Sequence, residues 1–310
     1  MEFFHESVLV EEVIEGLDCQ KGLIYVDATG GGGGHSKEIA KRIYPDGKLI
    51  VTDVDPDAIK AANENLKPWI EIVTILKANY FKIPEILRTF NIEKITGGIL
   101  FDLGASYYQF ITGEKGFSFS KEARLDMRFD PQNPISAYEI VNNFTEKELI
   151  RIFKDYGEER FSRRIAKNIV EKRKKYPIKT TTELANIIKS DIPFSSKYKI
   201  HPATRVFQAL RIAVNDELNN LENTLKQIIP LLEKNAKIVV ISFHSLEDRL
   251  VKNLFKYYSS NCRCLPEQAK CLCEAKQLEI LTKKPIIPSQ DEIKKNPSSR
   301  SAKLRIAKKI

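Results

Sequence analysis

The stretch VDATGGGGGHS, residues 26–36, decides the fold of this chain. Apolar residues from Leu23 lead into Asp27, five glycines follow, and a helical pattern runs from about Ser36 to Arg42. A strand, a glycine loop and a helix in this order open a nucleotide-binding α/β domain, because a backbone without Cβ atoms lets a ligand approach closely. A flexible linker is the alternative, but linkers are seldom flanked so tightly by a buried strand and a helix. The stretch therefore predicts a ligand-binding loop.

Apolar strands alternate with helices over the first hundred residues, which predicts a mainly parallel sheet covered on both faces. The predicted strands are residues 23–27, 48–54, 72–76 and 98–103. Three of them end in an acidic residue, Asp27, Asp53 or Asp102. Because the carboxyl ends of parallel strands form the ligand crevice of an open α/β sheet, we expect these carboxylates to line one site.

The alternation stops near Gln109 and resumes after residue 203. Residues 110–203 contain three predicted helices, at 145–156, 158–175 and 180–189, and no clear buried strand. Between residues 145 and 179, twelve Lys and Arg face six Asp and Glu. This excess favours recognition of a polyanion, although exposed helices are often charged. We predict an inserted helical recognition domain at 110–203, within an α/β domain made of 1–109 and 204–310. The second segment is expected to contain a helix at 203–232, a strand at 236–243 and edge strands at 278–282 and 301–307.

The bulk composition is that of a soluble globular protein of 310 residues with a net charge of +9. A modest positive charge is compatible with a nucleic-acid partner and also with an ordinary solvated surface. The first residues lack the pattern of a signal peptide, and no apolar run approaches the ~20 residues of a membrane span. The five cysteines are not the framework of a small secreted domain. We therefore expect a cytoplasmic protein.

The spacing of the glycine loop excludes two common ligands. A dinucleotide fingerprint needs a third glycine where His35 or Ser36 stands, and a P-loop needs a lysine at position 35. A second acidic residue, Asp53, stands twenty positions after Gly33, where a carboxylate can accept the hydroxyls of an adenosine ribose. S-adenosylmethionine fits this pattern, because it has no pyrophosphate and its sulfonium is favoured by acidic groups.

Nine motifs distributed over the chain resemble one family, the bacterial ribosomal RNA small-subunit methyltransferase H family. The resemblance runs from His5 to Arg305. The motifs are DATxGxGGHS (27–36), DLGxS (102–106), GFSF (116–119), LDMR (125–128), YGEER (156–160), HPATR (201–205), RIxVNxEL (211–218), SFHSLEDR (242–249) and NPxSRS (296–301).

This resemblance implies a Rossmann-like class I methyltransferase that uses S-adenosylmethionine to methylate N4 of a cytidine in the decoding region of 16S ribosomal RNA. The implied partner is that RNA, in the small ribosomal subunit, and a homodimer is conceivable. Two departures are visible: glycines at 30 and 32 replace bulkier residues, and Tyr107-Tyr108 replaces a common Ser-Pro. The implied cofactor contacts are Gly33, Gly34, His35, Asp53, Tyr80, Asp102 and Gln109.

The chemistry of the implied reaction selects further candidates. Because the lone pair of N4 is delocalised into the ring, the enzyme must align the amino group and offer it an acceptor. Asp102 is the expected catalytic residue and His244 a second candidate, for which a helix-capping role is at least equally good. The target base must also be unstacked to reach a pocket. The candidate phosphate partners are Arg128, Arg205, Arg211, Arg249, Arg300 and Arg305.

Two features near the C-terminus stay open. Cys262, Cys264, Cys271 and Cys273 form two close pairs that suit zinc, but Cys-x-Cys spacing is unusual and the metal is left undecided. Residues 281–310 carry nine Lys and Arg against two acidic residues, which favours RNA contact over a merely solvated edge. The rival functions are a non-catalytic RNA-binding or assembly protein and, less favoured, a nicotinamide-dependent oxidoreductase.

Overall fold

The computed structural model describes residues 7–104, 115–192, 201–262 and 275–310. The chain divides into two compact units. Residues 1–104 and 218–310 form what we call the sheet unit, and residues 105–217 form the helical unit. The predicted insert, residues 110–203, falls inside the helical unit, which also takes in the helix that follows it.

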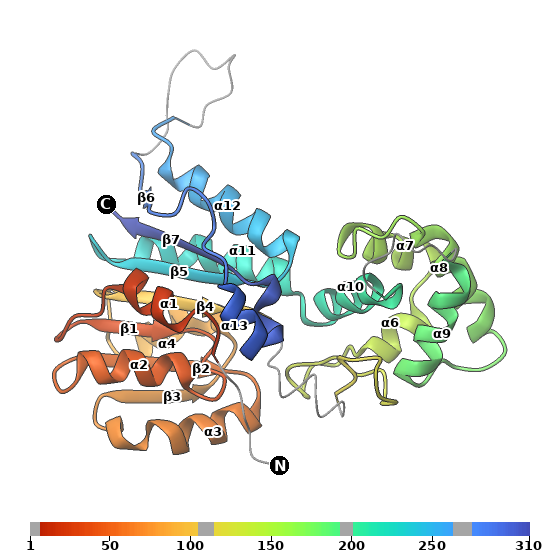
Figure 1. Ribbon diagram of the computed structural model, residues 1–310, viewed down its shortest axis with the longest axis horizontal. Coiled ribbons are helices and arrows are strands. Elements are labelled where there is room, and N and C mark those ends of the chain that lie inside the picture. The colour runs from red at the N-terminus through yellow and green to blue at the C-terminus, as the bar shows by residue number, and fades with distance from the viewer. Residues whose placement is uncertain (1–6, 105–114, 193–200, 263–274) are drawn as a thin grey trace. The chain divides into compact units, whose positions relative to one another are not determined.

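The sheet unit is built on seven strands in the order β3-β2-β1-β4-β5-β7-β6 (Figure 1). The first five run parallel, and β7 lies antiparallel between β5 and β6. The strand order reverses at β1, between β2 and β4, which is where ligands bind in such sheets. The predicted Rossmann-like fold is thus confirmed. The strands are β1 (Ile24–Asp27), β2 (Lys48–Asp53), β3 (Val73–Lys77), β4 (Gly98–Asp102), β5 (Lys237–Ser242), β6 (Leu278–Ile280) and β7 (Lys303–Lys309).

Helices cover both faces of this sheet, because successive strand residues point to opposite sides. Leu49 and Val51 enter one buried cluster with residues of α1, α2 and α3. Ile50, which lies between them, enters the other cluster, to which α4, α11 and α12 contribute. The helices of this unit are α1 (Val10–Leu17), α2 (Gly34–Ile43), α3 (Pro56–Leu66), α4 (Ile83–Thr89), α11 (Glu217–Ile228, in this unit from Leu218 on), α12 (Ser245–Ser259) and α13 (Gln290–Lys295).

Local geometry explains where α3 begins and why the chain forms two helices where one was predicted. Asp55 caps α3 by accepting from the backbone N–H of Asp57, and Pro56 occupies the first helical position. The single helix predicted at 203–232 is wrong, because Asp216 adopts a left-handed conformation with φ 48°. This residue separates α10 (Ala203–Asn215) from α11.

The helical unit encloses a separate hydrophobic core formed by its helices and by residues 117–127. The three predicted helices are confirmed as α7 (Glu146–Asp155), α8 (Ser162–Arg173) and α9 (Thr181–Asp191), and α10 joins them. Helix α6 (Ala137–Asn143) is not among the predicted helices, although Ser136 and Glu139 form the capping box that marks its start. Thr145 with Glu148 and Thr180 with Glu183 cap α7 and α9 in the same way.

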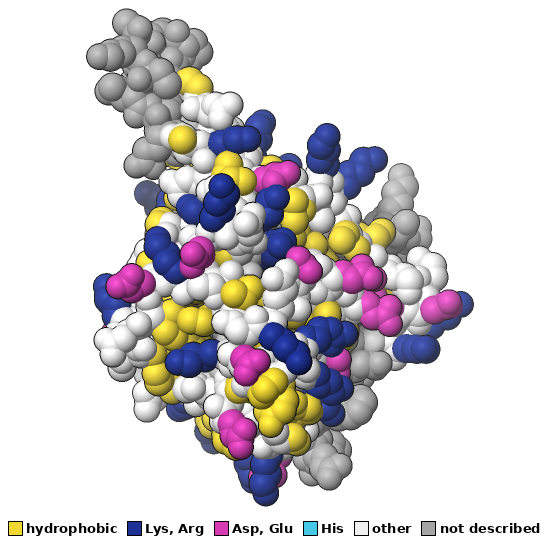
Figure 2. Space-filling model, turned by 90° about the vertical axis from the view of Figure 1, so that its left-hand side faces the viewer, with side chains coloured by type: hydrophobic (Ala, Val, Ile, Leu, Met, Phe, Trp, Pro, Cys, Tyr) yellow, Lys and Arg dark blue, Asp and Glu magenta, His cyan; other side chains and the backbone are white. Residues whose placement is uncertain are grey.

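The surface at the amino ends of the parallel strands has no single charge sign. Figure 2 shows this face, on which basic and acidic side chains are interspersed with apolar ones. Among the described helices, none is both long and apolar enough to span a membrane.

Candidate functional site

The glycine loop is held in a defined shape between the end of β1 and the start of α2. The backbone N–H of Gly31 donates to Asp53 Oδ2 at 2.8 Å, and Asn65 Nδ2 donates to the carbonyl of Gly32 at 2.7 Å. Gly33 has φ 85°, in the left-handed region that favours glycine, and α2 begins at the next residue. The loop is therefore a preformed cradle at the carboxyl end of β1.

Asp27 and Thr29 connect this loop to the neighbouring strands. Asp27 is buried and accepts a hydrogen bond from Ser36 Oγ at 2.6 Å. Burial raises the pKa of its carboxyl group above the usual value. Thr29 Oγ1 accepts from the backbone N–H of Asp102 at 2.6 Å, which fixes the end of β4 beside the loop. These contacts hold the carboxyl ends of β1 and β4 together.

His35 and Asp102 face each other at this edge. His35 lies in the first turn of α2 with only 4% of its surface exposed, and its Nε2 is 3.5 Å from Asp102 Oδ2. Burial lowers the pKa of His35, but the carboxylates of Asp102, Asp27 and Glu292 outweigh that effect, and the net shift is upward. The pair therefore favours a positive charge on His35 beside an acidic group.

Several polar atoms of this pair have no hydrogen bond within the part of the chain that the structure describes. Among the described residues, both ring nitrogens of His35 and Oδ1 of Asp102 are buried side-chain atoms without a hydrogen bond. An unsatisfied buried polar atom is costly, so such atoms mark places where a polar ligand completes the structure. The arrangement indicates a binding site for a polar ligand at the carboxyl ends of β1 and β4.

Asp53 and Tyr80 extend this edge across β2 and β3. Asp53 ends β2, its Oδ1 accepts from the backbone N–H of Asp55 at 2.8 Å, and burial raises the pKa of its carboxyl group to about 6. Each carboxylate oxygen has two lone pairs, so Asp53 can accept ligand hydroxyls besides its backbone donors. Tyr80 follows β3 and packs edge-on against Phe101, with ring centroids 5.9 Å apart.

The structure thus places six of the seven predicted cofactor residues along one edge of the sheet, after the carboxyl ends of β1 to β4. These six are Gly33, Gly34, His35, Asp53, Tyr80 and Asp102. Gln109 lies outside the described residues, as do Tyr107 and Tyr108. Their contact with a cofactor stays a prediction.

Comparisons with known proteins identify the family. The family model described as the MraW methylase family matches residues 2–310. The chain belongs to this family. It is 49% identical over 311 residues to the ribosomal RNA small subunit methyltransferase H of Clostridium botulinum strain Loch Maree, with all of both chains covered. The same named protein of Halothermothrix orenii is 47% identical, with 99% of this chain and 98% of the relative covered. A solved structure of a putative rRNA methylase from Clostridium thermocellum aligns over 99% of this chain with a TM-score of 0.46 and 10% identity.

As a member of this family, the chain is a methyltransferase that uses S-adenosylmethionine. The residues at the sheet edge fit that cofactor. Nδ1 of His35 and Oδ1 of Asp102 have no hydrogen-bond partner among the described residues; the first suits a carboxylate, the second suits a cationic or N–H-bearing group, and Asp53 suits ribose hydroxyls. The absence of a dinucleotide or P-loop pattern is consistent with a ligand that lacks a pyrophosphate.

The backbone of Gly33 gives a first testable prediction. We expect Gly33→Ala to weaken S-adenosylmethionine binding by about tenfold or more, because a Cβ atom at φ 85° is strained by roughly 1–2 kcal/mol and meets the side chain of Leu66. Isothermal titration calorimetry measures the change. Gly22→Ala is the matched control: Gly22 has φ 76° and open space around its Cβ position, before β1 begins. Equal loss of affinity in both variants would contradict a specific role of the loop.

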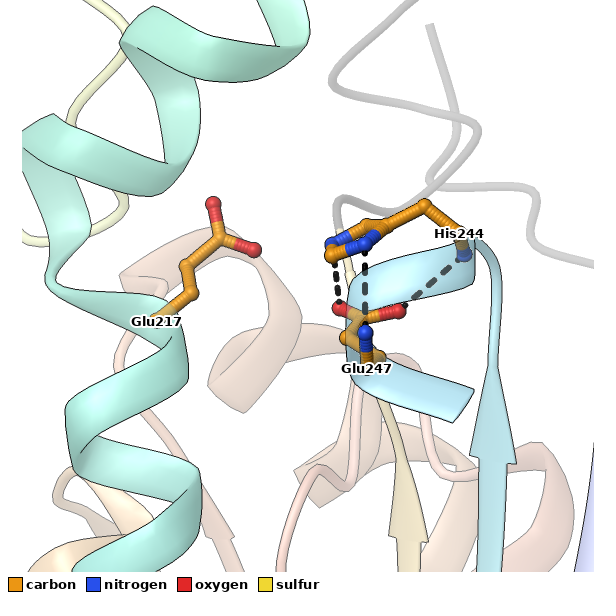
Figure 3. Close-up of side chains that lie close together, drawn as sticks. All are labelled: Glu217, His244 and Glu247. Carbon is orange, nitrogen blue, oxygen red and sulfur yellow. Dashed lines mark hydrogen bonds and ion pairs between the residues drawn. The ribbon is translucent and has the colours of Figure 1, made fainter. Parts of the chain in front are cut away.

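A second group of polar side chains lies near the carboxyl end of β5. Figure 3 shows the imidazole of His244 lying over Glu247, the third residue of α12. His244 is the N-cap residue of α12, and its Nδ1 accepts from the backbone N–H of Glu247 at 3.3 Å. The structure therefore supports the capping role of His244.

The capping geometry argues against a metal ion at His244 and Glu247. Because Nδ1 of His244 accepts a hydrogen bond, the proton of the neutral ring lies on Nε2, the atom that would have to bind the metal. Glu247 Oε2 already accepts from the backbone N–H of Phe243 at 2.9 Å. The donor set does not fit a metal site.

Three of the six arginines predicted to contact phosphate have carboxylate partners within the protein. Arg128 binds both oxygens of Asp126, and Arg211 pairs with Glu217. Arg305 is 7% exposed, and its Nε donates to Asp248 at 2.6 Å. The ion pairs give these side chains a structural role, and a phosphate contact by them stays untested. The exposed members of the set are Arg205, Arg249 and Arg300.

The predicted cysteine cluster falls mostly outside the described residues. Cys262 is exposed, and Cys264, Cys271 and Cys273 lie in the part of the chain that the structure does not describe. Zinc binding by these four thiols stays an open prediction.

Proposed function

We propose that this methyltransferase transfers the methyl group of S-adenosylmethionine to N4 of a cytidine in the decoding region of 16S ribosomal RNA. The observation that carries the proposal is the carboxylate of Asp102, which ends β4 beside His35 and whose buried Oδ1 has no hydrogen bond among the residues that the structure describes. The nine matching motifs and the names of the full-length relatives support the RNA substrate.

Asp102 suits the chemical demand of this reaction. The N4 amino group is a weak nucleophile, so an acceptor for one of its hydrogens increases the electron density on nitrogen while the N–C bond forms. The backbone of Asp102 is fixed through Thr29, and its carboxylate is held beside His35, which gives the acceptor a defined position. S-adenosylmethionine, when bound, supplies the methyl group and leaves as S-adenosylhomocysteine. The proton of N4 passes to the carboxylate or to solvent.

The helical unit offers basic side chains for the RNA partner. Exposed basic residues follow one another along α8 and on both sides of it, and Tyr176, just after the helix, is 79% exposed. Such a combination binds a phosphate backbone electrostatically and leaves an aromatic ring for stacking on a base. The exposed basic residues in this region are Arg160, Arg163, Arg164, Lys167, Lys172, Lys174 and Lys175.

Mass spectrometry of 16S ribosomal RNA from a bacterial strain that lacks the gene tests this function. We expect N4-methylcytidine to disappear from the decoding region and to return when the wild-type gene is restored. A variant that carries Asp18→Asn, a change at the opposite end of the sheet, should also restore it. An unchanged amount of N4-methylcytidine in the deletion strain would refute the assignment and leave a non-catalytic RNA-binding role as the better explanation.

A further inference from the structure

The first described residues of the chain lie directly on the glycine loop. Ser7 packs so closely on Gly34 that a Cβ atom added there would overlap its side chain. Val8 and Leu9 are 2% and 1% exposed and enter the same hydrophobic cluster as residues of α2 and α3. The segment from Ser7 to Leu9 therefore forms part of the wall against which the loop is packed.

The backbone at Leu9 needs a partner that its own segment does not provide. Leu9 is the N-cap residue of α1, has φ 53°, and carries an apolar side chain that cannot cap the helix. The buried backbone N–H of Leu9 donates to Oε1 of Glu292 at 2.8 Å. The two residues are 283 positions apart in the sequence, so this bond joins the N-terminal segment to α13.

Glu292 is itself held in place for this contact. Its backbone N–H donates to Oγ of Ser289, the N-cap residue of α13, at 3.1 Å. Its side chain is half-buried, and its negative charge acts on His35 together with the charges of Asp102 and Asp27. Glu292 thus relates to the site in two ways, through the segment that covers Gly34 and through its charge near His35.

We infer that Glu292 is a positioning residue of the cofactor site, which ties the N-terminal segment over Gly34 and so keeps the glycine loop in its binding shape. The carboxylate accepts the otherwise unpaired N–H of Leu9, Leu9 fixes Ser7, and Ser7 limits the movement of Gly34. This role rests on the location of the cofactor site and is independent of which base of the RNA is methylated.

Calorimetry with S-adenosylmethionine on the purified full-length protein tests the role of Glu292. We expect E292A to raise the Kd by about tenfold, because loss of the acceptor leaves a buried N–H unsatisfied. E292D should weaken binding similarly, because its shorter side chain does not reach Leu9. E292Q keeps an acceptor oxygen at the same distance and should stay within about threefold of wild type. The matched control is D291N, at an exposed neighbouring acid that pairs with Lys294.

The melting temperature, measured on the same samples, separates positioning from stability alone. A merely structural contact would lower the melting temperature of E292A and leave its Kd for S-adenosylmethionine equal to that of D291N, which would overturn the inference. E292Q binding as weakly as E292A would also overturn it, because the hydrogen bond would then not be the cause. If E292A does not fold, the comparison of E292D with E292Q decides in the same way. Because cofactor binding needs no RNA, failure of the N4-cytidine assignment would leave these results unaffected.

Discussion

Asp102→Asn should lower the rate of methyl transfer by about 10²–10⁴-fold at saturating S-adenosylmethionine, since that is the contribution of a well-placed acid–base group. The asparagine keeps the size of the side chain and one acceptor oxygen, but it removes the charge and replaces the second oxygen with an N–H donor. Its backbone N–H would still donate to Thr29, so the end of β4 should keep its position. Single-turnover transfer of a labelled methyl group to small ribosomal subunits from the deletion strain measures the rate.

Calorimetry separates catalysis by Asp102 from cofactor binding. If Asp102 acts on the amino group, the rate falls far more than the affinity for S-adenosylmethionine. A rate within threefold of wild type at saturating cofactor, together with a raised Kd, would show that Asp102 serves only the cofactor. Asp18→Asn is the control, because Asp18 is an exposed acid near the opposite end of the sheet whose loss should change neither quantity.

The sheet and its functional edge could be predicted because both depend on local patterns. Each apolar run that ends in an acidic residue became a strand with that residue at its carboxyl end, as Asp27, Asp53 and Asp102 show. Parallel pairing then places these ends on one edge, which follows from the fold class without any coordinates. The identity of the ligand could not be predicted from the strand pattern alone. It also required the mismatch with the dinucleotide and P-loop patterns and the resemblance of the other motifs to one methyltransferase family.

The contacts that hold the site in shape could not be predicted from local patterns. Glu292 is 283 residues from its partner Leu9, and no spacing rule relates them. Asn65 supports the glycine loop from α3, where an asparagine on an exposed helix surface is unremarkable in the sequence. Thr29 belongs to the quoted stretch, but its bond to the Asp102 backbone depends on β1 and β4 being neighbours. Such roles depend on tertiary packing.

Single backbone conformations and ion pairs account for the remaining differences. The helix predicted at 203–232 breaks because Asp216 turns left-handed, and its amphipathic pattern continues across the break. Arg305 is among the candidate phosphate partners, and folding pairs it with Asp248 of α12, a contact that the sequence pattern does not show, while its contact with phosphate stays a prediction. Charge counts along the sequence include arginines that ion pairs inside the protein will neutralise.

Binding of S-adenosylmethionine should weaken as the pH falls through about 6, because burial raises the pKa of Asp53 to that value. The anion accepts the backbone N–H groups of Gly31 and Asp55 and, as proposed, the ribose hydroxyls. Protonation turns one acceptor oxygen of Asp53 into a donor, so the carboxyl group can no longer accept all of these hydrogen bonds. We expect full affinity above pH 7 and a loss approaching tenfold at pH 5, as measured by calorimetry.

The stability of the free protein should change with pH in the opposite direction through this group. The pKa of Asp53 is about 6 in the folded protein and 3.8 for an ordinary aspartate, so the folded state holds more protons between these two values. The contribution of Asp53 to stability is therefore present at low pH and is lost as the pH rises through about 6. A cofactor affinity that falls between pH 7 and pH 5 consequently cannot be ascribed to acid unfolding at Asp53.

Asp53→Asn identifies the titrating group. The variant should bind S-adenosylmethionine about tenfold or more weakly at pH 8, because its amide N–H₂ opposes the backbone donor of Gly31 or Asp55. Its affinity should also no longer change around pH 6. His35 and Asp27 are the other groups at this edge whose pKa is raised above the usual value, so both gain a proton as the pH falls. If the pH dependence persists in Asp53→Asn, the titration belongs to His35 or Asp27, and Asp53 does not control cofactor binding through its charge.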